Sequence, residues 1–570
     1  MSTGSTIIVP DGFTLHTENT SHILLSSNEA FLNPVQEFNR DTSIACIRVW
    51  SEEMNKAKEA RWRQNQEKRA KKMKEGVAKR RKVENGEAQS ADEPLNEDQT
   101  GSVQPGESNP EGSTSTQTTS PQPYKFVLLE ALSATGLRSI RYAKEISLVK
   151  YVIANDLSPS ATAAMKRNVE INELGPVDEP PSTSAESTLS AGKVRINEGD
   201  ACTLMYSHRD EKNRVDVVDL DPYGTAAPFI DAAVQCVKDG GLLCVTCTDL
   251  SVLATTNYPE KCFSNYGGVP VKAEYCHEAA LRLVLHTLST SASRYGRYIE
   301  PLVSLSIDFY VRIFVRVKTA PLEVKKALTK TSTFHICTSC QSFYEQPLGR
   351  VIEKTQSAGN VNYLFKIQNG PPVTEKCPEC ESALHLAGPM WSGPLHDSEF
   401  VSKVLEHLEA NQDKYGTAVR MKGMLTVAKE ELPTPFYFTP AKIASFFHCT
   451  TPPLDDLASA LLHAGHKISR SHACAGSLKT TATRQDIHSV FRSWIKLNPV
   501  KMENVSEKSP ARRLLAKEPS FEANFTKHPD SVTPSGKMKL VRYQENPTSH
   551  WGPGTKAVSG SKRKRTKDDE

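Results

Sequence analysis

The chain has 570 residues, with 70 Lys plus Arg against 66 Asp plus Glu and a net charge of +4. This length predicts several domains, while the 38% hydrophobic content indicates that part of the chain is unfolded. No stretch approaches the roughly 18 uncharged apolar residues that cross a bilayer, which excludes an integral membrane protein. The N-terminal segment resembles neither a secretory signal nor a transit peptide. Thirteen scattered cysteines argue against a disulfide framework and favour a reducing compartment.

Charge is strongly segregated in the first quarter of the chain. Residues 54–82 contain thirteen Lys or Arg against three Glu, and residues 83–123 contain eight acids, no Lys or Arg and no aromatic side chain. The acidic stretch cannot bury enough apolar surface to offset its ordering entropy, so it is predicted to be disordered. The basic stretch is typical of a solvated helix, an RNA-contacting arm or a nuclear-import signal.

From residue 124 the sequence alternates between strand and helix patterns. Buried strands are predicted in KFVLLE, KYVIAND, KVRINEGDA, RVDVVDLDPYG and LLCVTCTDL. Helices are predicted between them, including ATAAMKRNVEIN after a Ser158-Pro159 cap and FIDAAVQCVKDGG, and residues 175–192 are predicted to be a loop. The alternation predicts an open α/β domain with a parallel sheet and helices on both faces.

After residue 325 the alternation stops. Two Cys-x-x-Cys units follow, and residues 436–494 are predicted to be mainly helical. Residues 501–570 are polar and basic and end in SKRKRTKDDE.

Polar side chains stand at the ends of four consecutive predicted strands. In doubly wound sheets ligands bind beyond the carboxyl ends of the strands, where this sequence places Glu130 with Ser133-Ala134-Thr135-Gly136, Asp156, Asp200 and Asp221-Pro222-Tyr223-Gly224. An acid after the second strand typically holds ribose hydroxyls, and the first loop lacks the dinucleotide fingerprint. Several carboxylates without a phosphate-loop lysine favour a nucleoside cofactor without a triphosphate, and S-adenosylmethionine fits best.

The turn Asp221-Pro222-Tyr223-Gly224 suits methylation of an exocyclic amine on a flat base. Its aromatic face can stack on the base while the carboxylate accepts a hydrogen bond from the amine, which orients the nitrogen lone pair. The alternative interpretation is a Pro-containing turn without chemistry. Asp219 is the weaker candidate for the acid because it lies within the strand.

Seven longer motifs all resemble the sequence motifs of one protein family. They are FLNPVQEFNRD at residues 31–41, LEALSATGLRSIRYA, ANDLSPSA, DLDPYG, CTDLSVLA, GPMWSGPLHD and RYQENPTSHWGP. In this order they resemble the tRNA (guanine-26, N2)-dimethyltransferases, which use S-adenosylmethionine to methylate a guanine in tRNA, commonly twice. The resemblance implies a Rossmann-like class I methyltransferase domain with a zinc-containing, mainly helical C-terminal domain.

The same resemblance implies a division of the chain into five regions. Residues 54–123 have no counterpart in the family and are interpreted as a basic, then acidic, disordered insert. The other regions are the N-terminal part of the methyltransferase domain (1–53), the S-adenosylmethionine-binding core (124–325), a zinc-binding and tRNA-binding domain (326–500) and a basic tail (501–570).

The resemblance also implies roles for single residues around the cofactor. Arg40 and Arg138 would contact S-adenosylmethionine. Its nucleoside part would be lined by Asp156, Asp200 and Ala201.

At the target base, the resemblance implies that Asp221 is the catalytic acid at guanine N2. Phe31 and Tyr223 would sandwich the base, although many relatives carry Phe in place of Tyr223. A guanine inside folded tRNA must leave its stack at a cost of a few kcal/mol, and stacking returns about 1–3 kcal/mol per base.

Cys337, Cys340, Cys377 and Cys380 form two Cys-x-x-Cys units separated by 36 residues. Two such units can complete a four-sulfur structural zinc site, and a hairpin in VNYLFKIQN would fill the long gap between them. The alternatives are reduced structural cysteines and a redox pair. His335 and His385 lie nearby in sequence and are interpreted as surface histidines.

The basic residues of LLHAGHKISRSHACAGSLKTTATRQD suit phosphate contacts from a helical, winged-helix-like module. The alternative is a helical domain with ordinary surface charge. Residues 68–82 and 562–565 resemble nuclear-import signals, which favours the nucleus, with a mitochondrial share as the alternative. The expected partner is tRNA, with no membrane and no obligate protein partner. The competing hypothesis is a catalytically inactive tRNA-binding protein of the same fold.

Overall fold

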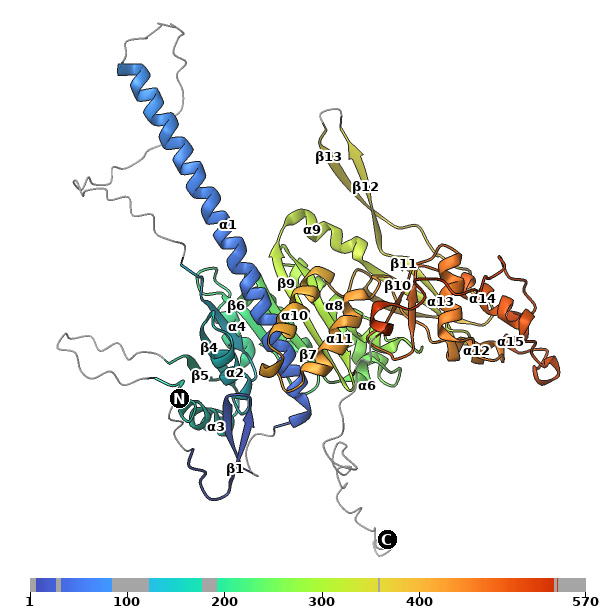
Figure 1. Cartoon of the computed structure of the whole chain (residues 1–570), viewed down its shortest axis with the longest axis horizontal. Helices are drawn as coiled ribbons and strands as arrows, with labels where there is room; N and C mark the ends of the chain where they lie inside the picture. Colours follow the sequence, from blue (N-terminus) through green and yellow to red (C-terminus); the bar gives the residue numbers. More distant parts are fainter. Residues whose placement is uncertain are drawn as a thin grey trace, which may run out of the picture. The chain divides into compact units, whose positions relative to one another are not determined.

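The computed structural model (Figure 1) describes residues 7–26, 32–84, 122–176, 192–356, 359–537 and 541. The chain forms two compact units. Unit 1 combines Met1–Val49 with Phe126–Glu570, and unit 2 is Trp50–Lys125.

A seven-stranded sheet forms the centre of unit 1. Its strand order is β5-β4-β3-β6-β7-β9-β8, and neighbouring strands from β5 to β7 pair in parallel whereas β9 pairs antiparallel with both β7 and β8. The strands are β3 (Phe126–Glu130), β4 (Val149–Asp156), β5 (Val194–Glu198), β6 (Val215–Leu220), β7 (Val237–Cys247), β8 (Arg297–Ile307) and β9 (Tyr310–Thr319). The predicted parallel α/β sheet is confirmed, and two antiparallel strands extend it.

Helices connect these strands and cover both faces of the sheet. Alternate residues of β6 show the two faces, because Leu220 belongs to the main hydrophobic core with α5 and α8, whereas Asp219 contacts Tyr142 on α2. The helices are α2 (Leu137–Glu145), α3 (Pro159–Glu170), α4 (Ala201–Ser207), α5 (Ala227–Cys236), α6 (Leu250–Leu253), α7 (Pro259–Tyr266), α8 (Cys276–Ser293) and α9 (Pro321–Lys326).

Two local predictions have a clear outcome. The Ser158 side chain caps α3 and Pro159 occupies its first turn, as the sequence predicted. The helix predicted in FIDAAVQCVKDGG was too long, because α5 ends at Cys236 and β7 begins at Val237. Val237 pairs with Val215 of β6, so sheet pairing overrides the helix pattern there.

An N-terminal hairpin packs against this domain. Its strands are β1 (Phe13–Glu18) and β2 (Ser21–Ser26), and the backbone N–H of Leu24 donates to Asn168 of α3 over 2.9 Å. Helix α1 (Glu37–Glu84) begins after it. Residues 37–49 of α1 lie in unit 1, where Ser43 accepts a hydrogen bond from Arg312 of β9.

Short sheets follow the α/β domain. A three-stranded sheet has the order β11-β10-β14 and is joined by a two-stranded hairpin that extends away from it (Figure 1). The strands are β10 (Thr331–Cys337), β11 (Phe343–Pro347), β12 (Gly349–Thr355), β13 (Val361–Ile367) and β14 (Leu384–Trp391). A hairpin does fill the gap between the cysteine units, but VNYLFKIQN supplies only its second strand, β13, which pairs with the preceding β12.

The rest of unit 1 is mainly helical. Its helices are α10 (Ser398–Ala410), α11 (Ala418–Glu430), α12 (Pro440–Phe447), α13 (Leu454–His463), α14 (Arg484–Leu497) and α15 (Pro510–Leu515), with a small hairpin of β15 (Ile468–Arg470) and β16 (Leu478–Thr480). The β15–β16 hairpin follows α12 and α13 and precedes α14, and the winged-helix-like module stays a prediction. Residues of α12–α14 share one hydrophobic core with the four cysteines.

Residues 501–537 differ from the predicted tail. Leu514 of α15 is buried in the core of the helical module, and its carbonyl accepts a hydrogen bond from Arg492 of α14 over 3.0 Å. The few apolar residues of this basic segment are sufficient to pack it. Residues 542–570 lie outside the described residues.

Within unit 2, residues 54–84 are helical as the C-terminal part of α1. This agrees with the solvated-helix interpretation of the basic stretch and differs from its placement in a disordered insert. Asn55 exchanges two hydrogen bonds with the backbone of Tyr124, at 2.7 and 3.1 Å. The predicted disorder of residues 85–121 and the loop at 177–191 lie outside the described residues. Among the described helices, none is both long and apolar enough to cross a membrane.

Candidate active site

A cavity of about 430 Å³ lies at the carboxyl ends of β3, β4 and β6. Because parallel strands end at the same edge of a sheet, the loops that follow them meet there. Residues before and within the start of α1 close another side of the cavity. It is lined by Leu32, Asn33, Gln36, Arg40, Glu130, Leu132, Ser133, Ala134, Thr135, Leu137, Arg138, Asp156, Asp221, Pro222, Tyr223, Thr248 and Phe309.

The loop after β3 is held tightly against the end of β4. The carboxylate of Asp156 accepts hydrogen bonds from the backbone N–H groups of Ala134 and Ser158, each over 2.9 Å. Gly136 adopts a φ of 77°, and a Cβ there would lie 3.0 Å from the Met165 side chain. The loop therefore needs glycine at this position. Each Asp156 oxygen keeps a lone pair for a further donor, such as a ribose hydroxyl.

A group of buried charges, here called the edge cluster, lies behind the cavity. It comprises Glu130, Arg138, Asp219, Asp221 and Arg312. The Arg138 guanidinium forms an ion pair with Asp221 and lies 3.6 Å from carboxylate oxygens of both Asp219 and Glu130. Arg312 donates to Asp219 over 2.8 Å.

Burial and charge act in opposite directions on the acids of the edge cluster. Burial raises the pKa of Glu130 to about 8, although Arg138 partly offsets it. Burial also opposes ionisation of Asp219, but the charges of Arg312 and Arg138 lower its pKa below the usual range. The Asp221 side chain is 13% exposed, whereas Asp219 is fully buried. Asp221 is therefore the acid of this pair that a substrate in the cavity can reach.

Arg40 reaches the cavity from α1 and is held by the N-terminal hairpin. Its Nε donates to Glu18 over 2.7 Å, and its Nη2 pairs with the other oxygen of the same carboxylate. Arg141 also contacts Glu18, over 3.1 Å. Burial disfavours the Glu18 carboxylate, but hydrogen bonds from His16 and Arg40 and the charges of both arginines bring its pKa to about 2. The hairpin thus fixes one wall of the cavity.

Two aromatic side chains line the cavity among the described residues. Tyr223 is 81% exposed, and Phe309 is 47% exposed. Phe309 lies in the two-residue turn between β8 and β9, next to Asp308, which adopts a φ of 44° and accepts a hydrogen bond from Arg420 over 2.7 Å. Phe31 lies outside the described residues.

Phe309 was not among the site residues predicted from the sequence. A signal was present, because the segment SLSIDFYVRIFV reads as two strands around a two-residue turn with an aromatic residue in it. The turn's place at the cavity follows only from the antiparallel addition of β9 to β7.

Most of the site residues predicted around the cofactor come together in this cavity. Arg40, Arg138 and Asp156 line it, as do Asp221 and Tyr223.

Two of the predicted residues are not among those lining the cavity. Asp200 caps α4 by accepting a hydrogen bond from the Thr203 N–H over 2.7 Å, and Ala201 is buried in the core beneath it.

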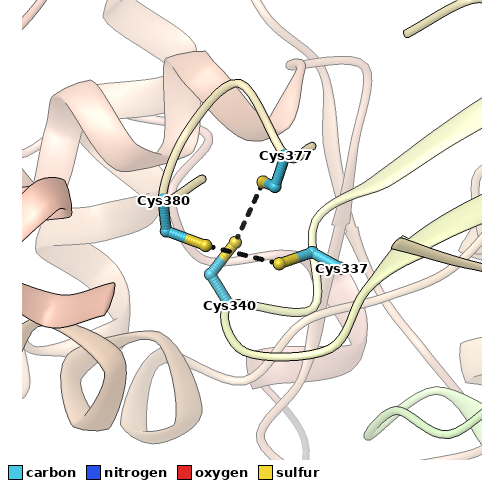
Figure 2. A group of neighbouring side chains, drawn as sticks. All are labelled: Cys337, Cys340, Cys377 and Cys380. Carbon is cyan, nitrogen blue, oxygen red and sulfur yellow. Dashed lines mark hydrogen bonds between the residues drawn. The ribbon is translucent and has the colours of Figure 1, made fainter. Parts of the chain in front are cut away.

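The four cysteines of the two Cys-x-x-Cys units converge on one point (Figure 2). Their sulfur atoms all lie within 4.8 Å of one another, with Cys337 and Cys380 3.4 Å apart and Cys340 and Cys377 3.7 Å apart. A tetrahedral ion with Zn–S bonds of about 2.3 Å requires sulfur separations of about 3.8 Å. All four side chains are buried, so the donor set fits a closed four-sulfur site.

Known proteins match this chain over nearly its whole length. Residues 12–492 match the family model of the N2,N2-dimethylguanosine tRNA methyltransferases. The tRNA (guanine(26)-N(2))-dimethyltransferase of Schizosaccharomyces pombe is 43% identical over 95% of this chain and 92% of its own length. The human enzyme of the same name is 41% identical over 94% of this chain and 76% of its own length. A mitochondrial one from Saccharomyces cerevisiae is 40% identical over 95% of this chain and 92% of its own length.

The fold has a counterpart among solved structures. Trm1 from Pyrococcus horikoshii, solved with S-adenosyl-L-methionine, superimposes with a TM-score of 0.56 at 22% identity, covering 83% of this chain and 98% of the other. This likeness supports the Rossmann-like architecture. From the family match and the relatives' identity over nearly its whole length, the chain belongs to the N2,N2-dimethylguanosine tRNA methyltransferase family.

Proposed function

We propose that this protein transfers one or two methyl groups from S-adenosylmethionine to the exocyclic N2 of guanine at position 26 of tRNA. The observation that carries the proposal is the cavity at the strand ends, where the Arg138-paired carboxylate of Asp221 lies beside the exposed rings of Tyr223 and Phe309. The names of the relatives support the same reaction, substrate and position.

The cofactor end of the cavity lies between Asp156 and the loop after β3. When bound, S-adenosylmethionine supplies an electrophilic methyl group. Asp156 accepts the ribose hydroxyls with its remaining lone pairs. Arg40 and Arg138 border the methionine side. Asp200 and Ala201 do not line the cavity, and the family resemblance alone supports their place on the nucleoside side.

Asp221 orients the target amine. Its carboxylate accepts one N–H of guanine N2, so that the nitrogen lone pair points toward the methyl group. Arg138 holds the carboxylate in place. Transfer would form the N–C bond as the methyl–sulfur bond of the bound cofactor breaks, with the electron pair left on the sulfur of the departing thioether. Asp221 is positioned to receive the proton that the amine loses and to pass it to water. One N–H remains after the first transfer, so the same contact serves a second.

Aromatic side chains hold the base after it leaves the tRNA stack. Tyr223 and Phe31 provide the sandwich that the family resemblance implies, and Phe309 adds a ring on the β8–β9 turn. Each stacked base returns about 1–3 kcal/mol toward the cost of flipping.

We further propose that Cys337, Cys340, Cys377 and Cys380 hold a structural zinc ion. Four buried sulfurs leave no open coordination position, so the ion would stabilise the fold rather than act on substrate. The site shares a core with α12–α14, which makes it a structural part of the helical module.

In this scheme residues 124–325, with residues 1–53, carry out methyl transfer, and residues 326–500 hold zinc and the tRNA body. Residues 54–123 are an insert and residues 501–570 a basic C-terminal segment. The basic runs at 68–82 and 562–565 support a nuclear location; the second run lies outside the described residues. The relative named as mitochondrial supports mitochondria as a second location for part of the protein.

Labelled S-adenosylmethionine and unmodified tRNA, followed by nucleoside analysis, test the proposal. We expect N2-methylguanosine and N2,N2-dimethylguanosine, and no product on a tRNA with adenine at position 26. Another methylated base would overturn the substrate assignment. Binding of cofactor and tRNA without any product would identify an inactive binding protein of the same fold.

A further inference from the structure

A second cavity of about 430 Å³ lies in the C-terminal part of unit 1. It is formed by β11, the second Cys-x-x-Cys unit, the segment before α12 and the start of α14. None of its lining residues lines the candidate active site. The lining comprises Phe343, Tyr344, Glu345, Pro372, Pro378, Glu379, Pro435, Phe436, Tyr437, Phe438, Thr480, Ala482, Thr483, Arg484, Gln485 and Ile487.

Arg484, the first residue of α14, lines this cavity with unused hydrogen-bonding capacity. The residue is only 6% exposed, and its Nε and Nη1 atoms are buried without a hydrogen-bond partner. Its guanidinium carbon lies 5.7 Å from the ring centroids of both Phe343 and Phe438. Burial raises the pKa of the nearby Glu274 and the charge of Arg484 acts to lower it, but the Nε and Nη1 donors have no acceptor among the described residues. Because buried donors without acceptors are costly, this arrangement calls for a ligand that brings acceptors.

The two acids that line the cavity are already engaged by protein groups. Glu379 accepts hydrogen bonds from His488 over 2.7 Å and Arg492 over 2.9 Å, and Glu345 accepts one from Ser332 over 2.6 Å. Two carboxylates in the lining disfavour a phosphate or carboxylate ligand. They favour a neutral ligand with acceptors for the guanidinium and with donors for the remaining carboxylate lone pairs.

The other walls suit a flat ring. Phe343 and Tyr344 are half-buried on β11, with Phe436 and Phe438 behind them. Guanine combines a stacking face with the O6 and N7 acceptors that arginine binds in a bidentate manner, and with N1 and N2 donors on another edge. A cavity of this size falls in the range of about 300–1,000 Å³ of small-molecule sites, so it can take one nucleobase.

We propose that this cavity is a second base-binding pocket, which takes one unpaired guanine of the tRNA with its acceptor edge on Arg484. The inference rests on the proposed function, in that tRNA is the substrate. Its role is to fix the tRNA on the C-terminal module while the target base occupies the active site.

The test compares Arg484→Gln with Lys467→Gln in the full-length protein. Lys467 is exposed just before β15 and serves as the surface-charge control. We expect Arg484→Gln to raise the Kd and KM for tRNA about 10-fold. Its KM for S-adenosylmethionine and the salt dependence of tRNA binding should stay unchanged. Lys467→Gln should instead weaken binding slightly and reduce the salt dependence.

Unchanged tRNA affinity in a folded Arg484→Gln variant would overturn the proposal. A reduced salt dependence in that variant would also overturn it, because it would identify a phosphate contact. If the variant does not fold, ultraviolet crosslinking of tRNA to the wild-type protein decides the question. A guanosine attached to Phe343 or Tyr344 supports the pocket, and crosslinks elsewhere only would exclude it. The Kd for tRNA, its salt dependence and the crosslinks are measured without turnover, so they test the pocket even if the transfer assay fails; only the two KM values depend on that assay.

Discussion

Among the described residues of unit 1, two clusters of buried charges have similar chemistry and different access to solvent. The edge cluster opens onto the candidate active site through Asp221. The second, here called the sealed cluster, comprises Glu278, Arg282, Glu431, His472 and Lys479, whose side chains are all at most 1% exposed. Comparing the two shows that a buried carboxylate becomes available for chemistry only where a cavity reaches it.

The sealed cluster joins segments that are distant in sequence. Lys479 of β16 contacts both Glu278 of α8 and Glu431, each over 3.2 Å. His472 Nε2 accepts the backbone N–H of Ser306 on β8 over 3.1 Å, so its proton is on Nδ1 and is donated to Glu431 over 2.6 Å. The cluster thereby fixes the helical module to the edge of the large sheet.

The largest expected effect is on the rate of methyl transfer, when Asp221 of the edge cluster is replaced. Asp221→Ala should lower methyl transfer about 10²–10⁴-fold, because it removes the group that orients the amine. Cofactor binding and folding should persist, since Arg138 keeps Asp219 and Glu130 nearby. Single-turnover kinetics and equilibrium cofactor binding measure the two quantities, and near-normal turnover would remove Asp221 from the mechanism.

The matching change in the sealed cluster should affect stability rather than chemistry. Glu431→Ala leaves Lys479 with one acid and His472 without its acceptor, so we expect a loss of about 3–5 kcal/mol in the free energy of unfolding. Urea denaturation measures this loss. The rate constant for transfer in the surviving folded fraction should stay near the wild-type value, and a selective loss of that rate would contradict the separation of roles.

Removing one sulfur tests whether the cysteine site is a third stabilising centre. Cys377→Ser should lose bound zinc and lower the melting temperature of the C-terminal module, because three sulfurs no longer complete the site. Cys449→Ser, which alters a half-buried cysteine outside the four, is the control and should keep its metal. Equal metal content in both variants would count against zinc.

Substitutions of Phe309 test whether the candidate active site includes a residue that was not predicted from the sequence. Phe309→Ala should raise the activation free energy of transfer by about 1–3 kcal/mol, because it removes the stacking contribution of one ring. Phe309→Tyr should retain activity because it keeps the ring. Measured kcat/KM values for tRNA that are the same in Phe309→Ala and wild type would exclude Phe309 from base binding.

A final prediction concerns the pH dependence of stability. The pKa of Glu130 rises from 4.5 to about 8 on folding, so the folded state binds more protons than the unfolded state between these values. Stability from this group is present at low pH and is lost as the pH rises through that window. Between about pH 5 and pH 8, wild type should therefore lose more unfolding free energy than Glu130→Gln. Parallel curves from urea titrations would show that Glu130 does not contribute.

Sequence by itself determined the parts of this protein that local patterns encode. Buried strands ending in Glu130, Asp156 and Asp221 fixed a parallel sheet whose acids share one edge, because parallel strands terminate together. The spacing of two Cys-x-x-Cys units was sufficient to predict a cluster of four sulfurs. The family motifs then supplied Arg40 and Arg138, which no periodicity singles out.

Tertiary structure alone decided which charged residues pair and which remain exposed. Lys479 and Arg484 belong to a stretch that reads as a basic, phosphate-contacting surface, yet Lys479 is buried in the sealed cluster and Arg484 lines the second cavity. The Arg138–Asp221 pair and the position of Phe309 likewise join residues far apart in the chain. Local sequence sets helix, strand and turn, but burial and ion pairing depend on which distant element packs on each residue, and only the complete fold specifies that.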